Sequence, residues 1–124
     1  MKIGIVGAAG RMGQMCIRQV HESQDSVVSG ATEIAGHEAL GCDVGEIAGV
    51  GNIGVPLSEN AEEMVLGADA IIDFTSPSAT AFFADLCSKK GTALITGTTG
   101  LDAKQEEKLA DASKQAVIVR APNI

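Results

Sequence analysis

The chain begins Met1-Lys2-Ile3-Gly4-Ile5-Val6 and continues Gly7-Ala8-Ala9-Gly10-Arg11-Met12-Gly13. The apolar residues 3–6 predict a buried strand and the residues after Gly10 open a helical pattern, so the glycines lie in a strand-to-helix turn. Glycine at position 7 permits a tight turn, at 10 lets backbone amides approach a pyrophosphate, and at 13 lets the helix lie close to the sheet. A generic turn would also use glycines, but strand, turn and helix in this order favour a dinucleotide phosphate site.

Short β-branched segments alternate with helical segments along the whole chain. This alternation predicts an α/β fold, a Rossmann-like doubly wound parallel sheet with helices on both faces. Strands are expected at Lys2–Val6, Val27–Thr32, Ala70–Phe74, Ala93–Thr96 and Val117–Arg120, with a weaker sixth run at Ile53–Val55. Helices are expected at Arg11–His21, from Asn60 to Leu66, at Pro77–Lys90 and from Asp102 onward, with Asn60/Glu63 and Asp102/Gln105 resembling capping boxes.

One segment lacks periodicity. Residues 35–54 contain six glycines, and a stretch of this composition between regular elements is expected to be the most mobile loop of the chain.

Composition limits the class of protein. The chain has 124 residues, 45% of them hydrophobic, and a net charge of −7, which is typical of one soluble domain and argues against a nucleic-acid-binding surface. Apolar runs are too short for a membrane span, and no export signal precedes the first strand, so a cytoplasmic location is expected. The three cysteines, Cys16, Cys42 and Cys87, have no metal-ligand spacing, which predicts reduced thiols and no metal site.

Two charged residues lie where a dinucleotide would need them. Glu33 ends the second expected strand, twenty residues after Gly13, where such folds place an acid on the adenosine ribose; a solvated carboxylate at a strand end is the alternative. Arg11 stands in the first helical turn, where a cation opposes the helix dipole unless an anion offsets it. A bound phosphate would offset it, whereas pairing with a surface carboxylate would give Arg11 only a structural role.

Polar residues follow the third and fourth expected strands. Asp73-Phe74-Thr75-Ser76-Pro77 and Gly97-Thr98-Thr99-Gly100 therefore lie at the carboxyl edge of the sheet, where open α/β folds bind ligands. Thr98 and Thr99 are candidates to orient a nicotinamide or a carboxylate, and a polar turn flanked by glycines is an equally good explanation. Ala121-Pro122-Asn123-Ile124 follows the fifth strand in the same way.

Taken together, five motifs resemble the dihydrodipicolinate reductase family. They are Gly7–Gly13, Gly41-Cys42-Asp43-Val44-Gly45, Ile72-Asp73-Phe74-Thr75, Gly97-Thr98-Thr99-Gly100 and Ala121-Pro122-Asn123-Ile124. The resemblance implies that residues 1–124 form the NAD(P)H-binding domain of a reductase of lysine and diaminopimelate biosynthesis. It assigns the cofactor to Gly7, Ala8, Ala9, Gly10, Arg11, Met12, Glu33, Phe74, Thr75, Gly97, Thr98, Thr99, Ala121, Pro122, Asn123 and Ile124.

The resemblance also implies partners that this chain does not supply. The family's second domain carries a His-His-x-x-Lys motif, which is absent from this sequence, and it forms the substrate pocket and the homotetramer. The chain alone is therefore expected to bind the cofactor without turnover. Ile34 stands where NADPH-preferring members often have arginine, which favours NADH or use of both cofactors. A regulatory module that senses NAD(H) is the alternative function, because a fold alone does not define chemistry.

Overall fold

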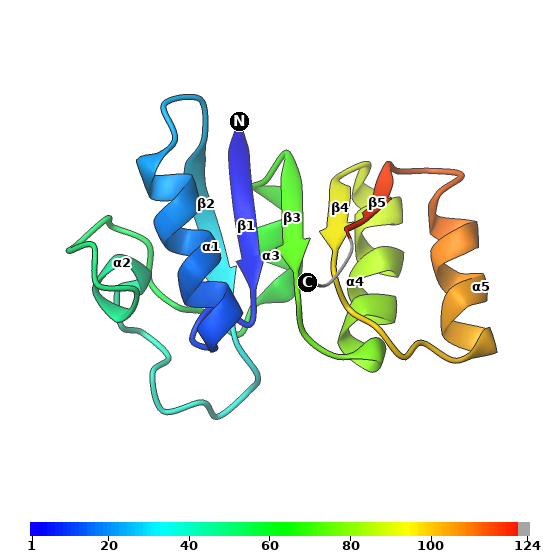
Figure 1. The fold of residues 1–124 in the computed structure, drawn as a ribbon, viewed down its shortest axis with the longest axis horizontal. Helices are drawn as coiled ribbons and strands as arrows, with labels where there is room; N and C mark the ends of the chain where they lie inside the picture. Colours follow the sequence, from blue (N-terminus) through cyan, green and yellow to red (C-terminus); the bar gives the residue numbers. More distant parts are fainter. Residues whose placement is uncertain (122–124) are drawn as a thin grey trace.

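The computed structural model describes residues 1–121, which contain one parallel sheet of five strands (Figure 1). The strands are β1 (Lys2–Val6), β2 (Val27–Thr32), β3 (Ala70–Asp73), β4 (Ala93–Thr96) and β5 (Ile118–Arg120). The helices are α1 (Arg11–Glu22), α2 (Val44–Ile47), α3 (Ala61–Leu66), α4 (Pro77–Lys90) and α5 (Ala103–Ala112). The predicted α/β class and all five strands are confirmed, although β3 ends and β5 begins one residue inside the predicted bounds.

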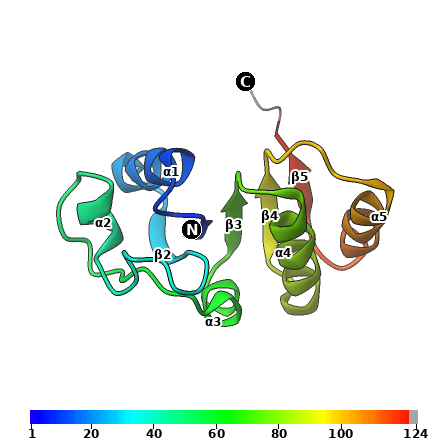
Figure 2. The ribbon, with the colours of Figure 1, turned by 90° about the horizontal axis from the view of Figure 1, so that it is seen from below.

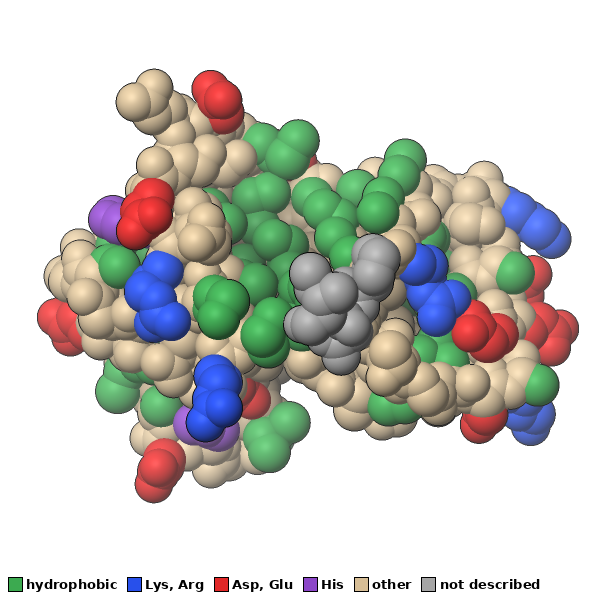
Figure 3. Space-filling model, viewed as in Figure 1, with side chains coloured by type: hydrophobic (Ala, Val, Ile, Leu, Met, Phe, Trp, Pro, Cys, Tyr) green, Lys and Arg blue, Asp and Glu red, His purple; other side chains and the backbone are tan. Residues whose placement is uncertain are grey.

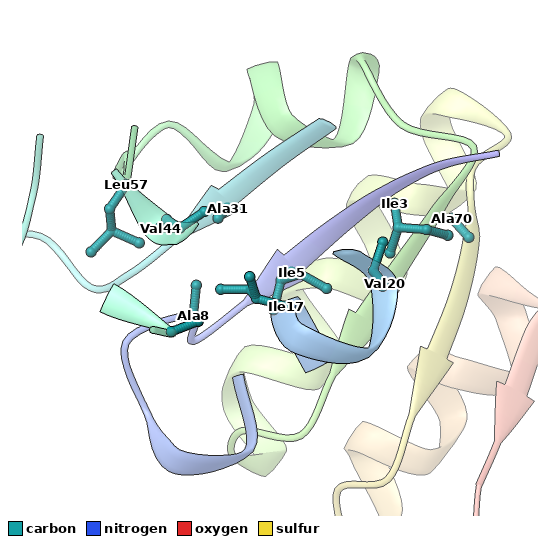
Figure 4. Close-up of a cluster of buried hydrophobic side chains, with 10 residues drawn as sticks. Ile3, Ile5, Ala8, Ile17, Val20, Ala31, Val44, Leu57 and Ala70 are labelled. Carbon is teal, nitrogen blue, oxygen red and sulfur yellow. The ribbon is translucent and has the colours of Figure 1, made fainter. Parts of the chain in front are cut away.

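Helices lie on both faces of the sheet, with α1 on one face and α3 and α4 on the other (Figure 2). Successive residues of a strand point to opposite faces, so β1 contributes to two cores. Ile5 packs with Ile17 of α1 in the first core (Figure 4), and Val6 belongs to a second core with Ile71 and Phe83. In the strand order β2-β1-β3-β4-β5, β2 lies on one side of β1 and the later strands are added on the other side. This change of side between β1 and β3 is a topological switch point, which opens a crevice at the carboxyl ends of the strands.

The α1 face of the sheet is only partly covered. Within residues 1–121, no helix lies over this side of β3, β4 and β5 (Figure 2). Ile72 and Ile95 are partly buried on this face, and Val119 is 46% exposed. In the view of Figure 1, which looks onto the α1 face, Figure 3 shows hydrophobic side chains gathered near the middle of the molecule. This half of the face is therefore an apolar surface rather than a helix-packed core.

The weak sixth strand predicted at Ile53–Val55 is wrong, because the pairing occurs a few residues later. Ser58 forms an isolated parallel bridge with Thr32, and the Ser58 N–H donates to the Ala31 carbonyl at 3.0 Å. The N–H groups of residues 53–55 instead donate to the carboxylate of Asp43. They are therefore not available to a sheet ladder.

Asp43 also organises the glycine-rich segment that the sequence leaves without regular structure. Its carboxylate accepts hydrogen bonds from five backbone N–H groups, those of residues 45, 46, 53, 54 and 55, at 2.8–3.3 Å. These bonds, with that of Ile53 contributing most, hold the pKa of Asp43 below its usual value. Helix α2 starts directly after Asp43 and buries Val44. The aspartate in the middle of the Gly41–Gly45 motif thus closes the loop on itself.

Of the two capping boxes predicted from the sequence, the one at α5 is complete and the one at α3 is only half formed. Asp102 and Gln105 form the full capping box that the sequence predicts for α5. At α3, the Asn60 side chain accepts from the Glu63 N–H at 3.0 Å, but the reciprocal bond is missing. The Asn60 N–H donates instead to the hydroxyl of Ser58, two residues earlier in the chain, at 2.9 Å.

Candidate dinucleotide site

A cavity lies at the carboxyl ends of β1, β2 and β3, at the switch point of the sheet. Its volume is about 660 Å³, which lies in the range typical of small-molecule and cofactor sites. Seven of the predicted site residues line it, namely Gly7, Gly10, Arg11, Met12, Glu33, Phe74 and Thr75. Three separate segments of the sequence therefore meet at one cavity.

The glycine turn presents its free amides later in the sequence than the motif suggests. The N–H groups of Ala8, Ala9 and Gly10 donate internally, to the Thr32 carbonyl, the Glu33 carboxylate and the Gly7 carbonyl. Within residues 1–121, the N–H groups of residues 11–13 have no hydrogen-bond acceptor. The first turn of α1 is thus the part of the motif that offers donors to an anion. Ala8 itself is fully buried in the core.

Gly13 brings this helix end close to the strand. A β-carbon at Gly13 would overlap the Gly7 carbonyl oxygen and lie 2.7 Å from Ala8 Cα. Gly7 has a φ of +66°, which favours glycine. The two positions confirm the sequence interpretation of a tight turn followed by a closely packed helix.

Arg11 is exposed beside the free amides, and it forms no ion pair with any carboxylate in the described part of the chain. The alternative of a surface arginine paired with a carboxylate is therefore not what the structure shows. A cation at a helix N-terminus opposes the helix dipole. An anion bound in front of α1 would offset both the charge of Arg11 and the partial positive charge of the helix N-terminus.

Glu33 is half-buried at the end of β2 and bonds to two backbone amides. One carboxylate oxygen accepts from the Ala9 N–H and the other from the Ile34 N–H, both at 3.1 Å. A carboxylate has about four acceptor positions, so one remains on each oxygen. Two neighbouring hydroxyl groups of a ribose could donate to them.

The cavity contains further residues that the sequence analysis does not assign. Glu59 and Ala61 reach it because Ser58 pairs with β2, a long-range contact with no sequence signal. Phe82 and Phe83 form another wall; Phe83 is buried, whereas Phe82 is 55% exposed. Two adjacent aromatic residues in a chain with three phenylalanines are the one signal that could have identified this wall.

The turn after β4 does not line this cavity. Gly97 packs so closely on the Phe74 ring that a β-carbon there would overlap it. Thr98 is 8% exposed, and its hydroxyl accepts from the Thr75 N–H at 3.1 Å. Thr99 is exposed, and the Ala121 N–H donates to the Thr96 carbonyl at 2.8 Å. The nicotinamide role of these residues stays a prediction, and the assignments to Pro122, Asn123 and Ile124 lie outside the described residues.

The cysteines differ in exposure. Burial, with a smaller contribution from the negative charge of Asp73, raises the pKa of Cys87 to about 12, and burial raises the pKa of Cys16. Cys42 is exposed. Residues 1–121 contain no group of three or more His, Cys, Asp or Glu side chains arranged to hold a metal ion. No helix in the same range is long and apolar enough to span a bilayer.

The parallel sheet, its switch-point cavity and the glycine turn define a Rossmann-like domain of the dinucleotide-binding class. A family model described as "Dihydrodipicolinate reductase, N-terminus" matches residues 1–124. The chain belongs to this family, as its motifs predict.

Individual relatives agree with this assignment. The chain is 43% identical over 121 residues to 4-hydroxy-tetrahydrodipicolinate reductase of Halorhodospira halophila, covering 98% of this chain and 45% of that protein. It resembles the solved structure of dipicolinate-bound dihydrodipicolinate reductase from Paenisporosarcina sp. TG-14, with a TM-score of 0.71 and 22% identity over 91% of this chain and 43% of that one. The myo-inositol 2-dehydrogenase of Lactobacillus plantarum shares the fold, with a TM-score of 0.74 and 20% identity over 98% and 36% of the two chains.

The chain spans about half the length of the curated relatives it matches. These relatives are named as reductases, so they do not favour the alternative of a regulatory NAD(H)-sensing module.

Proposed function

We propose that this chain binds NAD(P)H in the switch-point cavity and serves as the cofactor domain of a 4-hydroxy-tetrahydrodipicolinate reductase. The proposal rests on groups that meet at one cavity. The N–H groups of residues 11–13 and the Arg11 side chain have no acceptor or carboxylate partner within residues 1–121, and Glu33 offers a free acceptor position on each carboxylate oxygen. Bound NAD(P)H would supply a hydride, which a reductase of this family delivers to a cyclic dicarboxylate.

Each group has a defined task in this proposal. The amides of residues 11–13 donate to the pyrophosphate, and Arg11 adds a positive charge that the dipole of α1 reinforces. Glu33 accepts from the adenosine ribose hydroxyls while its two existing bonds to Ala9 and Ile34 keep the carboxylate in place. Thr99 and the chain around Ala121 hold the nicotinamide end.

The test is a calorimetric titration of the folded chain with NADH. We expect saturable binding by the wild type and loss of binding by Gly10→Val, because the added methyl groups fill the space in front of the α1 amides. A β-carbon at Gly10 would meet only the Gly7 carbonyl oxygen, at 3.3 Å, so circular dichroism should report a folded variant. Unchanged NADH affinity in folded Gly10→Val would refute the site.

Cofactor preference follows from the charges around the cavity. Its lining contains two acids, Glu33 and Glu59, and one cation, Arg11, while Ile34 beside them is 74% exposed and cannot pair with a phosphate. NADH should therefore bind at least as tightly as NADPH, whose 2′-phosphate would approach Glu33. A tenfold preference for NADPH, equivalent to about 1.4 kcal/mol, would contradict this reasoning.

Ile34→Arg tests the same point from the opposite direction. Charge-assisted hydrogen bonds contribute about 1.5–3 kcal/mol, so this variant should bind NADPH about tenfold more tightly or better, with NADH nearly unchanged. The gain should shrink as salt rises. Ile34→Gln is the matched uncharged control and should show no such gain. An equal effect of arginine and glutamine on NADPH would show that position 34 does not face the 2′-phosphate.

Turnover, substrate and assembly belong to the whole reductase. We expect the isolated chain to bind NADH without reducing the dicarboxylate, and measurable reduction by this chain alone would contradict that. The homotetramer and the cytoplasmic location are proposals on the same basis. We also propose that the chain has no nucleic-acid partner, and its net charge of −7 supports this.

A further inference from the structure

Asp73, the last residue of β3, is a completely buried carboxylate with no cationic partner in the described part of the chain. Its neighbours are hydroxyl groups instead. One carboxylate oxygen accepts from the Thr75 hydroxyl and from the Thr75 N–H, the latter at 3.2 Å. The other faces the hydroxyls of Thr80, Thr96 and Thr98, with Thr96 at 3.0 Å and Thr98 at 3.5 Å.

The hydroxyl groups of Thr96 and Thr98 are both oriented to donate to Asp73. The Thr96 hydroxyl oxygen accepts from the Thr98 N–H at 3.2 Å, and that of Thr98 accepts from the Thr75 N–H at 3.1 Å. Both hydroxyls therefore have their own protons left to donate to Asp73. The five donors occupy both carboxylate oxygens, and no buried polar side-chain atom in residues 1–121 is left without a partner. Such a fully satisfied network rigidifies the elements that it joins.

The elements joined are the two turns that follow β3 and β4. The Gly97 N–H donates to the Asp73 carbonyl at 3.0 Å, and the Phe74 ring packs directly on Gly97. Thr75 of the first turn lines the dinucleotide cavity. Thr98 of the second turn has both its amide and its hydroxyl bonded inside the network. The position of residues 97–99 relative to the cavity thus depends on groups that contact Asp73.

We propose that Asp73 is a positioning residue, whose carboxylate fixes the turn after β4 against the turn after β3 and so places the nicotinamide-binding edge relative to the pyrophosphate site. This inference rests on the proposed NADH binding. The groups assigned to the other half of the cofactor, Glu33 and the amides of residues 11–13, form no bond to Asp73. Loss of the positioning should therefore weaken binding of NADH and spare binding of ADP, which contains only the adenosine and diphosphate.

The experiment compares two isosteric variants, Thr98→Val and Thr80→Val. Both remove one hydroxyl from the same oxygen of Asp73, and both positions are buried, at 8% and 0% exposure. Thr98 lies in the turn after β4, whereas Thr80 lies in α4. Dissociation constants for NADH and for ADP are measured by calorimetry on each folded variant. Thermal unfolding gives the loss of stability separately.

Thr98→Val should weaken NADH binding at least fivefold and change ADP binding less than twofold, and Thr98→Ser, which keeps the hydroxyl, should restore NADH binding. Thr80→Val should lower the unfolding temperature without changing the ratio of the two affinities. Asp73→Asn should change the ratio of NADH to ADP affinity in the same direction as Thr98→Val. The double variant Asp73→Asn/Thr98→Val should change this ratio no more than Asp73→Asn alone, because both substitutions remove the same contact between Asp73 and the turn after β4. If Asp73→Asn does not fold, the two threonine variants decide.

An unchanged ratio in Thr98→Val, or an equal change in Thr80→Val, would show that the network only stabilises the fold. Additive losses in the double variant would show that Thr98 binds the cofactor independently of Asp73. Each of these results overturns the positioning role while leaving NADH binding intact. Failure of the wild type to bind NADH would instead refute the proposed function.

Discussion

Gly13→Ala tests whether the close approach of α1 to the end of β1 holds the domain together. The new β-carbon would overlap the Gly7 carbonyl oxygen and lie 2.7 Å from Ala8 Cα. Optimal contacts between carbon atoms are about 3.5–4.0 Å, so the helix start must retreat by about 1 Å. The obstructing atoms are backbone atoms of Gly7 and of the buried Ala8, which cannot rotate away as a side chain could.

The cost follows from what α1 buries. Ile17 is fully buried and Val20 is 7% exposed, and both pack on the sheet. Overpacking a core of this kind costs about 1–3 kcal/mol, and the upper end applies because backbone atoms collide. Alanine recovers up to about 1 kcal/mol through its higher helix propensity. The net loss in the free energy of unfolding should therefore be about 2 kcal/mol.

Urea unfolding followed by circular dichroism measures this loss. With a slope of about 1–3 kcal/mol per molar urea for a small protein, the midpoint should fall by about 1 M. Gly67→Ala is the control, since its β-carbon would meet nothing closer than 3.5 Å, and a surface change of this kind stays within about 0.5 kcal/mol. A Gly13→Ala midpoint equal to that of the wild type would refute the packing argument.

Two further predictions follow from ionisable groups. The hydrogen bonds that Asp43 accepts lower its pKa in the folded chain. The stability that these bonds contribute is therefore fully present above the usual aspartate pKa of about 3.9, and it is lost as the pH falls through the lowered pKa of the folded chain. Asp43→Asn should therefore be less stable than the wild type at pH 7, with the difference shrinking below about pH 4 in urea titrations; a constant difference would contradict this assignment. In thiol labelling followed by mass spectrometry at pH 8, exposed Cys42 should react first and buried Cys87, with a pKa of about 12, only on unfolding. Labelling of native Cys87 at the rate of Cys42 would show that the second core, to which Cys87 belongs, opens readily.

The sequence by itself determined the elements whose signals are local. Alternation of apolar strands with capped helices predicted the five strands, and Asp102 with Gln105 predicted the start of α5, because strand burial and helix capping depend on residues close in the chain. The glycine spacing from Gly7 to Gly13 identified the turn at the cavity, since the backbone geometry of such a turn limits the residue types that fit.

Tertiary structure decided what depends on contacts between distant residues. The pairing of Ser58 with Thr32 brought Glu59 to the cavity, and Asp43 took the amides that a strand at residues 53–55 would have used. The sequence placed Asp73 at a strand end, but only the packing of β3, β4 and α4 surrounded its carboxylate with threonine hydroxyls. A buried carboxylate needs hydrogen-bond partners wherever in the chain they lie. Thr75 is a near neighbour in the sequence, but the hydroxyls of Thr96 and Thr98 reach Asp73 only through the fold.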